Sequence, residues 1–380
     1  DAIAPPTVGV AVGGGFGTQL GGSVGFYFSD MLGEHNLTVS ALANGTFQDL
    51  GGQVTYVNRA QRLNYGAQLS HIPYRSLGGR VGRITDPVTG QPAILYQEIE
   101  QRIFESQFGF FGIYPLRPTR RFEVQTSLTR YGFDLDERNL FLQPNGSVRI
   151  TERDLDTRDP LYFSQSAAAY VVDFSNFGFT SPVQGGRYRL QVGATLGSTQ
   201  YGTVLGDLRR YLRVGQVTLA GRLLHIGNYG ADDEDLFAEE YLGYSFQPSY
   251  VRGYSFYSFD AEECFAEVDA SGSGCPPLDR LIGTRVAVTG AEVRVPLLGT
   301  EQYGLINFPY LPTELSAFVD AGVAWTADEP PVWEWARNTS ERVPVVSTGV
   351  SARMNLFGAA VVEVFYAYPF QRPEKGGFIG

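Results

Sequence analysis

The chain has 380 residues, of which 43% are hydrophobic and 13% aromatic, and its formal net charge is −11. This acidic balance disfavours nucleic acid as a partner, and no uninterrupted apolar run of about 18 residues offers a transmembrane helix. Residues 1–7, which include Pro5 and Pro6, indicate a linker from a missing upstream region and do not have the pattern of a signal peptide.

Apolar and polar residues alternate with a period of two from one end of the chain to the other, which is the pattern of β-strands. In residues 187–196, Arg187, Arg189 and Gln191 share one face, whereas the other face is wholly apolar. Strands also end in aromatic residues such as Tyr366 and Tyr368. These features favour a transmembrane β-barrel with lipid outside and a polar lumen inside. Soluble all-β domains with a dry core are the alternative.

Sixteen strands can be assigned in chain order, and an even number suits a closed bacterial barrel. We therefore predict an all-β fold in which residues 8–380 form a single 16-stranded antiparallel transmembrane β-barrel domain. The strands are expected near residues 8–16, 20–29, 36–43, 52–59, 63–72, 94–114, 119–132, 159–175, 185–197, 200–212, 214–227, 283–296, 314–325, 343–355, 359–369 and 376–380.

With both chain ends on the periplasmic side, the long connections 73–93, 133–158, 228–282 and 326–342 fall on the outer face. The sixth outer loop, residues 228–282, carries "SYVRGYSF", in which Arg252 stands among aromatic residues. Burying a guanidinium costs several kcal/mol unless an ion pair and hydrogen bonds replace its water. The strands that follow offer lumen-facing carboxylates, Glu292 and Asp320, and bidentate pairing with a carboxylate favours Arg over Lys.

Two short motifs lie in this order, two strands apart. The first is Val251-Arg252-Gly253-Tyr254, and the second is an F-x-D-x-G pattern formed by Phe318, Asp320 and Gly322. Together they resemble the outer-membrane barrel-assembly superfamily that includes BamA, TamA and the two-partner-secretion transporters. The likeness covers roughly residues 185–380, and "GAEVRVP" (290–296) and "EVFYAYPF" (363–370) add partial matches.

The resemblance implies sixteen strands and a sixth outer loop folded into the lumen, where its R-G-[FY] tip meets the F-x-D-x-G strand. It also implies a location in the bacterial outer membrane and insertion or translocation of polypeptides there, without enzymatic activity, cofactor or metal. Outer-membrane lipid and other protein subunits or polypeptide cargo would be the partners. Two features depart from the family: no POTRA domain precedes the barrel, and the last strand does not end in an aromatic residue.

Within this family Arg252 would act as a latch that holds the sixth loop, although the same pair could serve only folding and plugging. Family members act through the seam between the first and last strands, and Gly13, Gly14 and Gly15 would weaken pairing there. The glycines could equally relieve crowding where the barrel curves. The alternative function is a plugged barrel that serves as membrane anchor or structural subunit for a periplasmic domain or surface complex, without transport. A diffusion pore is disfavoured by the plugging loop.

Other signals are weaker. Cys264 and Cys275 lie in a Gly/Ser/Asp-rich loop and predict a local disulfide. The acidic run at 232–240 could bind calcium but lacks the spacing of a defined loop, which favours a solvated outer surface. The three histidines share no motif with a nucleophile, so a hydrolase triad has no support. Trp333 and Trp335 could dock a surface partner or pack on the barrel rim.

Overall fold

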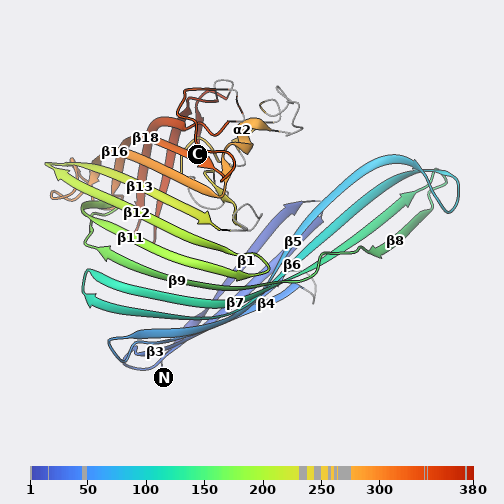
Figure 1. Cartoon of the computed structure of the whole chain (residues 1–380), viewed down its shortest axis with the longest axis horizontal. Coiled ribbons are helices and arrows are strands. Elements are labelled where there is room, and N and C mark those ends of the chain that lie inside the picture. Colours follow the sequence, from blue (N-terminus) through green and yellow to red (C-terminus); the bar gives the residue numbers. More distant parts are fainter. Residues whose placement is uncertain are drawn as a thin grey trace. The chain divides into compact units, whose positions relative to one another are not determined.

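The computed structural model describes residues 2–15, 17–44, 49–230, 238–243, 250–255, 258–260, 263, 275–337, 339, 341–372 and 375–380. Most of these residues lie in β-strands and very few are helical, as the alternation predicted (Figure 1). No helix among them is long and apolar enough to cross a membrane. The chain forms two compact units. Unit 1 comprises Asp1–Tyr114, Glu123–Ser166 and Leu196–Ser198, and unit 2 comprises Pro115–Phe122, Ala167–Thr195 and Thr199–Gly380.

Unit 1 is built from antiparallel neighbours. Each strand from β1 to β5 pairs with the one that follows it, and β7 pairs with β8. Parts of β6, β7 and β9 belong to unit 2. The strands are β1 (Ala2–Gly15), β2 (Gly17–Ser29), β3 (His35–Asn44), β4 (Leu50–Asn58), β5 (Asn64–Thr85), β6 (Pro92–Arg117), β7 (Arg120–Leu142), β8 (Val148–Asp154) and β9 (Leu161–Asp173).

Two of the predicted outer loops are wrong in part, because they are largely β-structure. β5 and β6 stay paired as far as Thr85 opposite Pro92, and β7 and β8 pair from Asp136 opposite Asp154 to Leu142 opposite Val148. Glycines and charged residues hide the period-two pattern in segments 73–93 and 133–158. The antiparallel ladder depends on main-chain groups, so such side chains do not prevent pairing.

Unit 2 continues the same architecture, with antiparallel pairing along β11, β12, β13, β16, β18, β19, β20 and β21. These strands are β11 (Pro182–Gly197), β12 (Tyr201–Val214), β13 (Val217–Tyr229), β16 (Arg285–Gly299), β18 (Thr313–Trp325), β19 (Val345–Leu356), β20 (Ala360–Pro369) and β21 (Phe378–Ile379). The shorter elements are β10 (Asn176–Phe177), β14 (Glu240–Tyr241), α2 (Pro276–Asp279), β15 (Ile282–Gly283) and β17 (Ile306–Asn307).

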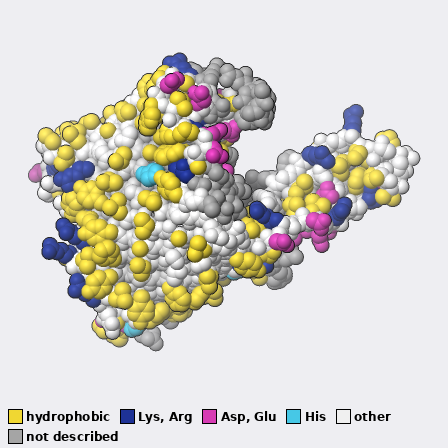
Figure 2. All heavy atoms as spheres, in the orientation of Figure 1, with side chains coloured by type: hydrophobic (Ala, Val, Ile, Leu, Met, Phe, Trp, Pro, Cys, Tyr) yellow, Lys and Arg dark blue, Asp and Glu magenta, His cyan; other side chains and the backbone are white. Residues whose placement is uncertain are grey.

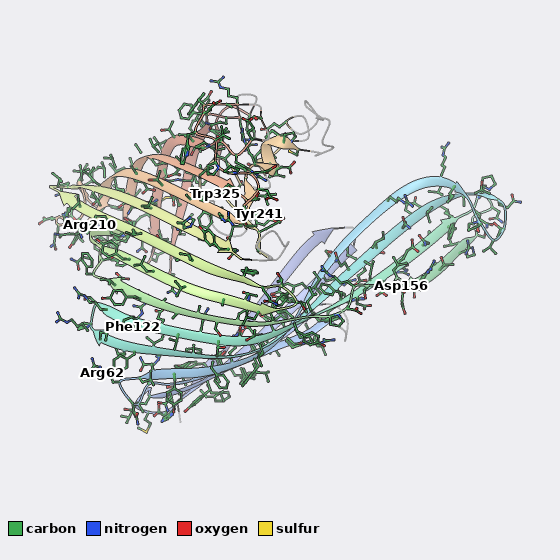
Figure 3. All side chains as sticks on the ribbon, in the orientation of Figure 1. Arg62, Phe122, Asp156, Arg210, Tyr241 and Trp325 are labelled. Carbon is green, nitrogen blue, oxygen red and sulfur yellow. The ribbon has the colours of Figure 1, made fainter. Side chains whose placement is uncertain are left out.

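The strands of unit 2 carry apolar residues on the exposed face, whereas polar and apolar residues share the buried face. On β18, Leu315 and Val319 are 42% and 51% exposed, whereas Ser316, Phe318 and Asp320 are buried. Apolar side chains accordingly gather on the visible surface (Figure 2), and side chains project from both faces of the strands (Figure 3). An apolar outer face and a polar inner face are what a strand with lipid on one side and a lumen on the other requires.

The described parts of the sixth loop pack against the inward face of unit 2. Leu242, Val251 and Tyr254 are wholly buried and join one apolar cluster with side chains of the strand wall. The wall members are Leu224, Ile226, Val286, Val288, Ala324 and Val345. The acidic run at 232–240 lies mostly outside the described residues, as does Cys264, so the Cys264–Cys275 disulfide stays a prediction.

Candidate latch site

Arg252 of the sixth loop is buried against three strands and meets a carboxylate on each. Its Nε donates to Asp320 Oδ2 at 2.7 Å and its Nη2 donates to Asp320 Oδ1 at 2.9 Å, a bidentate pair with β18. Nη2 also lies 2.7 Å from Glu292 Oε1 on β16, and Nη1 lies 3.4 Å from Glu363 Oε1 on β20. The backbone N–H of Arg252 donates to Asp320 as well, at 3.3 Å. The loop tip is thus tied to the wall by charge and by main chain.

The ring of Phe318 stacks against the guanidinium of Arg252. The guanidinium carbon of Arg252 lies 3.5 Å from the ring centroid of Phe318, which is a close cation–π contact. The ring of Phe318 packs closely over Gly349 of the neighbouring strand, where a Cβ would fall 2.6 Å from the ring. The aromatic residue of F-x-D-x-G therefore holds the arginine at the height of the carboxylate two residues along the same face.

Two glycines leave room for this arrangement. A Cβ on Gly322 would lie 2.8 Å from Val251 Cγ2, so a larger residue there would push the loop away. A Cβ on Gly290 would lie 2.9 Å from Asp320 Oδ1. Gly253 has φ +99°, a backbone conformation that side chains disfavour, and it turns the loop tip directly after Arg252.

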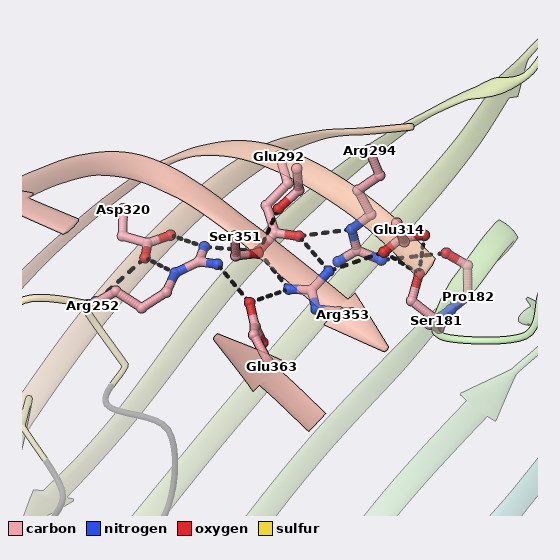
Figure 4. Close-up of polar contacts among 11 residues, drawn as sticks. Ser181, Pro182, Arg252, Glu292, Arg294, Glu314, Asp320, Ser351, Arg353 and Glu363 are labelled. Atoms are coloured by element: carbon pink, nitrogen blue, oxygen red, sulfur yellow. Dashed lines mark hydrogen bonds and ion pairs between the residues drawn. The ribbon is translucent and has the colours of Figure 1, made fainter. Parts of the chain in front are cut away.

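The carboxylates around Arg252 belong to a wider network along the wall (Figure 4). Arg353 of β19 contacts Glu292 at 3.1 Å, Glu314 at 3.3 Å and Glu363 at 3.0 Å. Arg294 donates to Glu292 at 2.6 Å, and Ser181 donates to Glu314 at 2.8 Å. Three arginines and four carboxylates therefore share one hydrogen-bonded chain, in which Asp320 pairs with Arg252 only among the described residues.

A second arginine, Arg372, ties the loop to the segment that follows β20. It is 2% exposed and donates to Glu263 at 2.7 and 2.8 Å, to the Gly253 carbonyl at 2.7 Å and to the Ser258 carbonyl at 2.7 Å. Its guanidinium carbon also lies 3.8 Å from the ring centroid of Phe259. Burial opposes ionisation of Glu263, but the bonds from Arg372 outweigh it and lower the pKa of Glu263.

Tyr254 completes this second attachment. Its hydroxyl donates to Gln371 Oε1 at 2.7 Å and accepts from the Gln371 N–H at 3.1 Å, and Gln371 is itself buried. Burial raises the pKa of Tyr254 to about 12, so the phenol stays neutral. The loop tip is therefore held twice, by Arg252 toward the wall and by Tyr254 and Gly253 toward residues 371–372.

The structure brings together the loop and wall residues that the motifs singled out: Val251, Arg252, Gly253, Tyr254, Glu292, Phe318, Asp320 and Gly322. Gly13, Gly14 and Gly15 lie elsewhere, at the end of β1 next to its turn into β2, where they oppose Gln19, Thr18 and Gly17. Sequence reasoning missed Arg353, Glu363, Gln371 and Arg372. The strand pattern could have shown Arg353 and Glu363, which occupy inward positions of their strands, whereas nothing in the sequence around residue 371 signals burial.

An antiparallel wall with an apolar outer face, and a loop arginine buried against its inner carboxylates, are the features expected of an outer-membrane assembly protein. Residues 19–377 match the Omp85 superfamily domain, and the chain belongs to the Omp85 superfamily. This is the superfamily that the motifs predicted. Its members are bacterial outer-membrane β-barrels that act in transport or assembly rather than as enzymes.

The BamA structure has a similar fold, and two CdiB structures also match. BamA from Haemophilus ducreyi lacking POTRA domains 1–3 is 13% identical with a TM-score of 0.55, over 99% of this chain and 68% of that one. CdiB from Escherichia coli is 12% identical, with a TM-score of 0.49 over 93% of this chain and 56% of that one. CdiB from Acinetobacter baumannii, also 12% identical, has a TM-score of 0.44 over 96% and 56%. No curated protein matches the chain by sequence.

Proposed function

We propose that this chain is a sixteen-stranded outer-membrane β-barrel of the BamA and TamA type, which inserts or translocates polypeptides at the outer membrane. The sixth loop, residues 228–282, closes the lumen, and Arg252 is the latch that keeps it there. The observation that carries this proposal is the burial of Arg252 against carboxylates of three different strands. Membership of the Omp85 superfamily supports it.

The latch fixes the strands of the wall near the end of the chain to one another, and it leaves the seam free to move. Asp320, Glu292 and Glu363 stand on β18, β16 and β20, so one loop residue holds these strands in register. In the proposed barrel, β1 and the last strands form the seam, where unpaired backbone groups can template an incoming strand. Gly13, Gly14 and Gly15 lower the side-chain packing available to β1, which favours a weak closure.

The test is to lock the proposed seam and measure insertion. Cysteine pairs would be placed one on β1 and one on the last strand, β21, with Cys264 and Cys275 replaced by serine, and the full chain would be reconstituted into liposomes. The readout is the rate at which an unfolded β-barrel substrate becomes protease-resistant. Oxidation should abolish the acceleration and reduction should restore it; a pair placed within β18 and β19, which are already neighbours, serves as control. Equal rates with a locked and an unlocked seam would refute the proposal.

The second attachment favours the alternative function, a plugged barrel that anchors another domain or subunit. Arg372, Gln371 and Tyr254 add bonds that hold the loop in place beyond those made by Arg252. A chain that never accelerates insertion, yet keeps its loop protease-resistant, would support this anchor function.

A further inference from the structure

The two long hairpins of unit 1 form an extension that is much longer than a membrane crossing needs. β6 has 26 residues and β5 has 22, whereas a crossing takes about 10 residues per strand. At about 3.3 Å per residue, the excess carries the paired ends of β5–β6 and β7–β8 tens of Å into the aqueous space. The pairing of β4 with β5 ends at Gly52 opposite His71, so β4 does not follow β5 into the extension.

Buried polar contacts hold the two hairpins together. Asp86, at the end of the first hairpin, is wholly buried and accepts two bonds from Arg149 of β8, at 3.1 and 2.5 Å. Gln143 donates to the same carboxylate at 3.2 Å, and Arg149 lies over the ring of Phe141 at 4.1 Å. Nearer the base, Arg102 is 4% exposed and binds Asp136 of β7. The extension is thus a built structure with a fixed shape.

β8 is the border strand of this extension (Figure 1). Gln143 bonds Ser147 and Leu155 bonds Leu135 through their main chains, which fixes the hydrogen-bonding phase of the β7–β8 ladder. In an antiparallel pair, every second residue directs its N–H and C=O away from the partner. Val148, Ile150 and Glu152 are those residues, and across the described part of the chain no other strand takes up these groups.

The two faces of the border strand differ in chemistry. Ala93, Leu95 and Phe141 form a buried cluster on one face of the extension, so Val148 and Ile150 lie on the opposite face, where they are 52% and 47% exposed. Val81 and Tyr96 extend this exposed apolar surface on the first hairpin, where they oppose each other. Apolar side chains are visible along the extension in Figure 2.

The other face of β8 carries two arginines and a threonine. Arg149 and Arg153 point there with Thr151, and Arg149 is committed to Asp86. No ion pair joins Arg153 to another residue in the described part of the chain, and its cross-strand neighbour Glu137 bonds Gln97 instead. A strand added to this edge would meet Val148 and Ile150 on one face, next to the Glu152–Arg138 ion pair, and the exposed Arg153 on the other.

We propose that β8 is a docking edge for an extended segment of a partner protein, whose residues alternate between apolar and acidic. The segment would add to the sheet through main-chain bonds to Val148, Ile150 and Glu152. Its apolar residues would continue the surface of Val148 and Ile150, and its acidic residues would face Arg153. Edge addition of this kind takes affinity from main-chain bonds and specificity from alternate side chains. The sequence places both hairpins on the outer face of the membrane, so the partner would lie there.

The test uses the full chain in detergent and fluorescein-labelled peptides of about eight residues. One peptide alternates Val and Glu, and its control has the same composition in two blocks. The alternating peptide should bind more tightly by fluorescence anisotropy. Ile150→Pro removes the N–H that points away from β7, and it leaves the hydrogen bonds between β7 and β8 intact. It should weaken binding about tenfold, as the loss of one such hydrogen bond implies. Ile150→Val, which keeps the N–H, should bind as the unaltered chain does.

Arg153→Glu gives a second readout that does not depend on a proline. It should weaken the Val/Glu peptide and strengthen a Val/Lys peptide by a similar factor. Equal binding of alternating and block peptides, or unchanged binding to both variants, would overturn the proposal. A dimer in sedimentation that Ile150→Pro abolishes would assign the edge to a second copy instead. Quenching of an Ile150→Trp variant by brominated lipid would assign it to the membrane. The insertion assay plays no part in these outcomes.

Discussion

Removal of the Arg252 side chain is the most direct test of the latch. In Arg252→Ala the carboxylates of Glu292 and Glu363 keep Arg353 as a partner, whereas Asp320 loses its ionic partner among the described residues. Breaking a buried pair costs about 3–5 kcal/mol. A cavity of about 210 Å³ beside Arg252 can admit water to the stranded carboxylate. The lower end, about 3 kcal/mol, is therefore expected.

A loss of about 3 kcal/mol shifts the balance between held and released loop by roughly a hundredfold. Limited proteolysis of the sixth loop in the folded, detergent-solubilised chain reports this population when reclosing outpaces cleavage. The cleavage rate should rise by about that factor. Arg210→Ala, which removes an exposed arginine of β12, is the matched control and should leave the rate unchanged (Figure 3).

A double-mutant cycle separates the pair from its surroundings. Asp320→Ala leaves Arg252 with Glu292 and Glu363, and the double variant should cost less than the sum of the two single variants. A cleavage rate for Arg252→Ala within twofold of the unaltered chain, or strict additivity in the cycle, would refute the latch.

Three further predictions use the same proteolysis assay. Gly322→Val places a side chain against Val251 and should release the loop at a cost of about 1–3 kcal/mol; unchanged cleavage would mean that this close approach is dispensable. Tyr254→Phe removes the hydroxyl that bonds Gln371 and should cost about 1–3 kcal/mol, with wild-type behaviour counting against the second attachment. Because the pKa of Glu263 is lowered from 4.5 by Arg372, its contribution is present above pH 4.5 and is lost as the pH falls below that value. Cleavage should rise on acidification, and Glu263→Gln should remove that rise; a rise that persists in the variant would assign it to other groups.

The faces of the wall strands could be predicted from the sequence, because successive side chains of a strand point to opposite faces. A period of two predicts that Leu315 and Val319 point outward. It predicts that Phe318 and Asp320 point inward, and the structure confirms both. Arg353 and Glu363 follow the same alternation, so their inward position could also have been predicted. Arg372 was not, since it follows the last long strand in an irregular segment, where no periodicity says which side chain is buried. The extension was missed because its charged and glycine-containing strands are exposed on both faces for much of their length.

The geometry of the latch indicates which strand can move with least loss. Arg252 holds Asp320 and Glu292 at 2.7 Å, and their side chains are 7% and 12% exposed. Its contact with Glu363 on β20 is longer, 3.4 Å, and that carboxylate is 29% exposed and shared with Arg353. Coulomb attraction weakens with distance and with access to water, so the bond to β20 is the weakest of the three. A displacement of β20 would therefore break Glu363 away first and leave the loop fixed to β16 and β18, which is the order that an opening seam beside β20 requires.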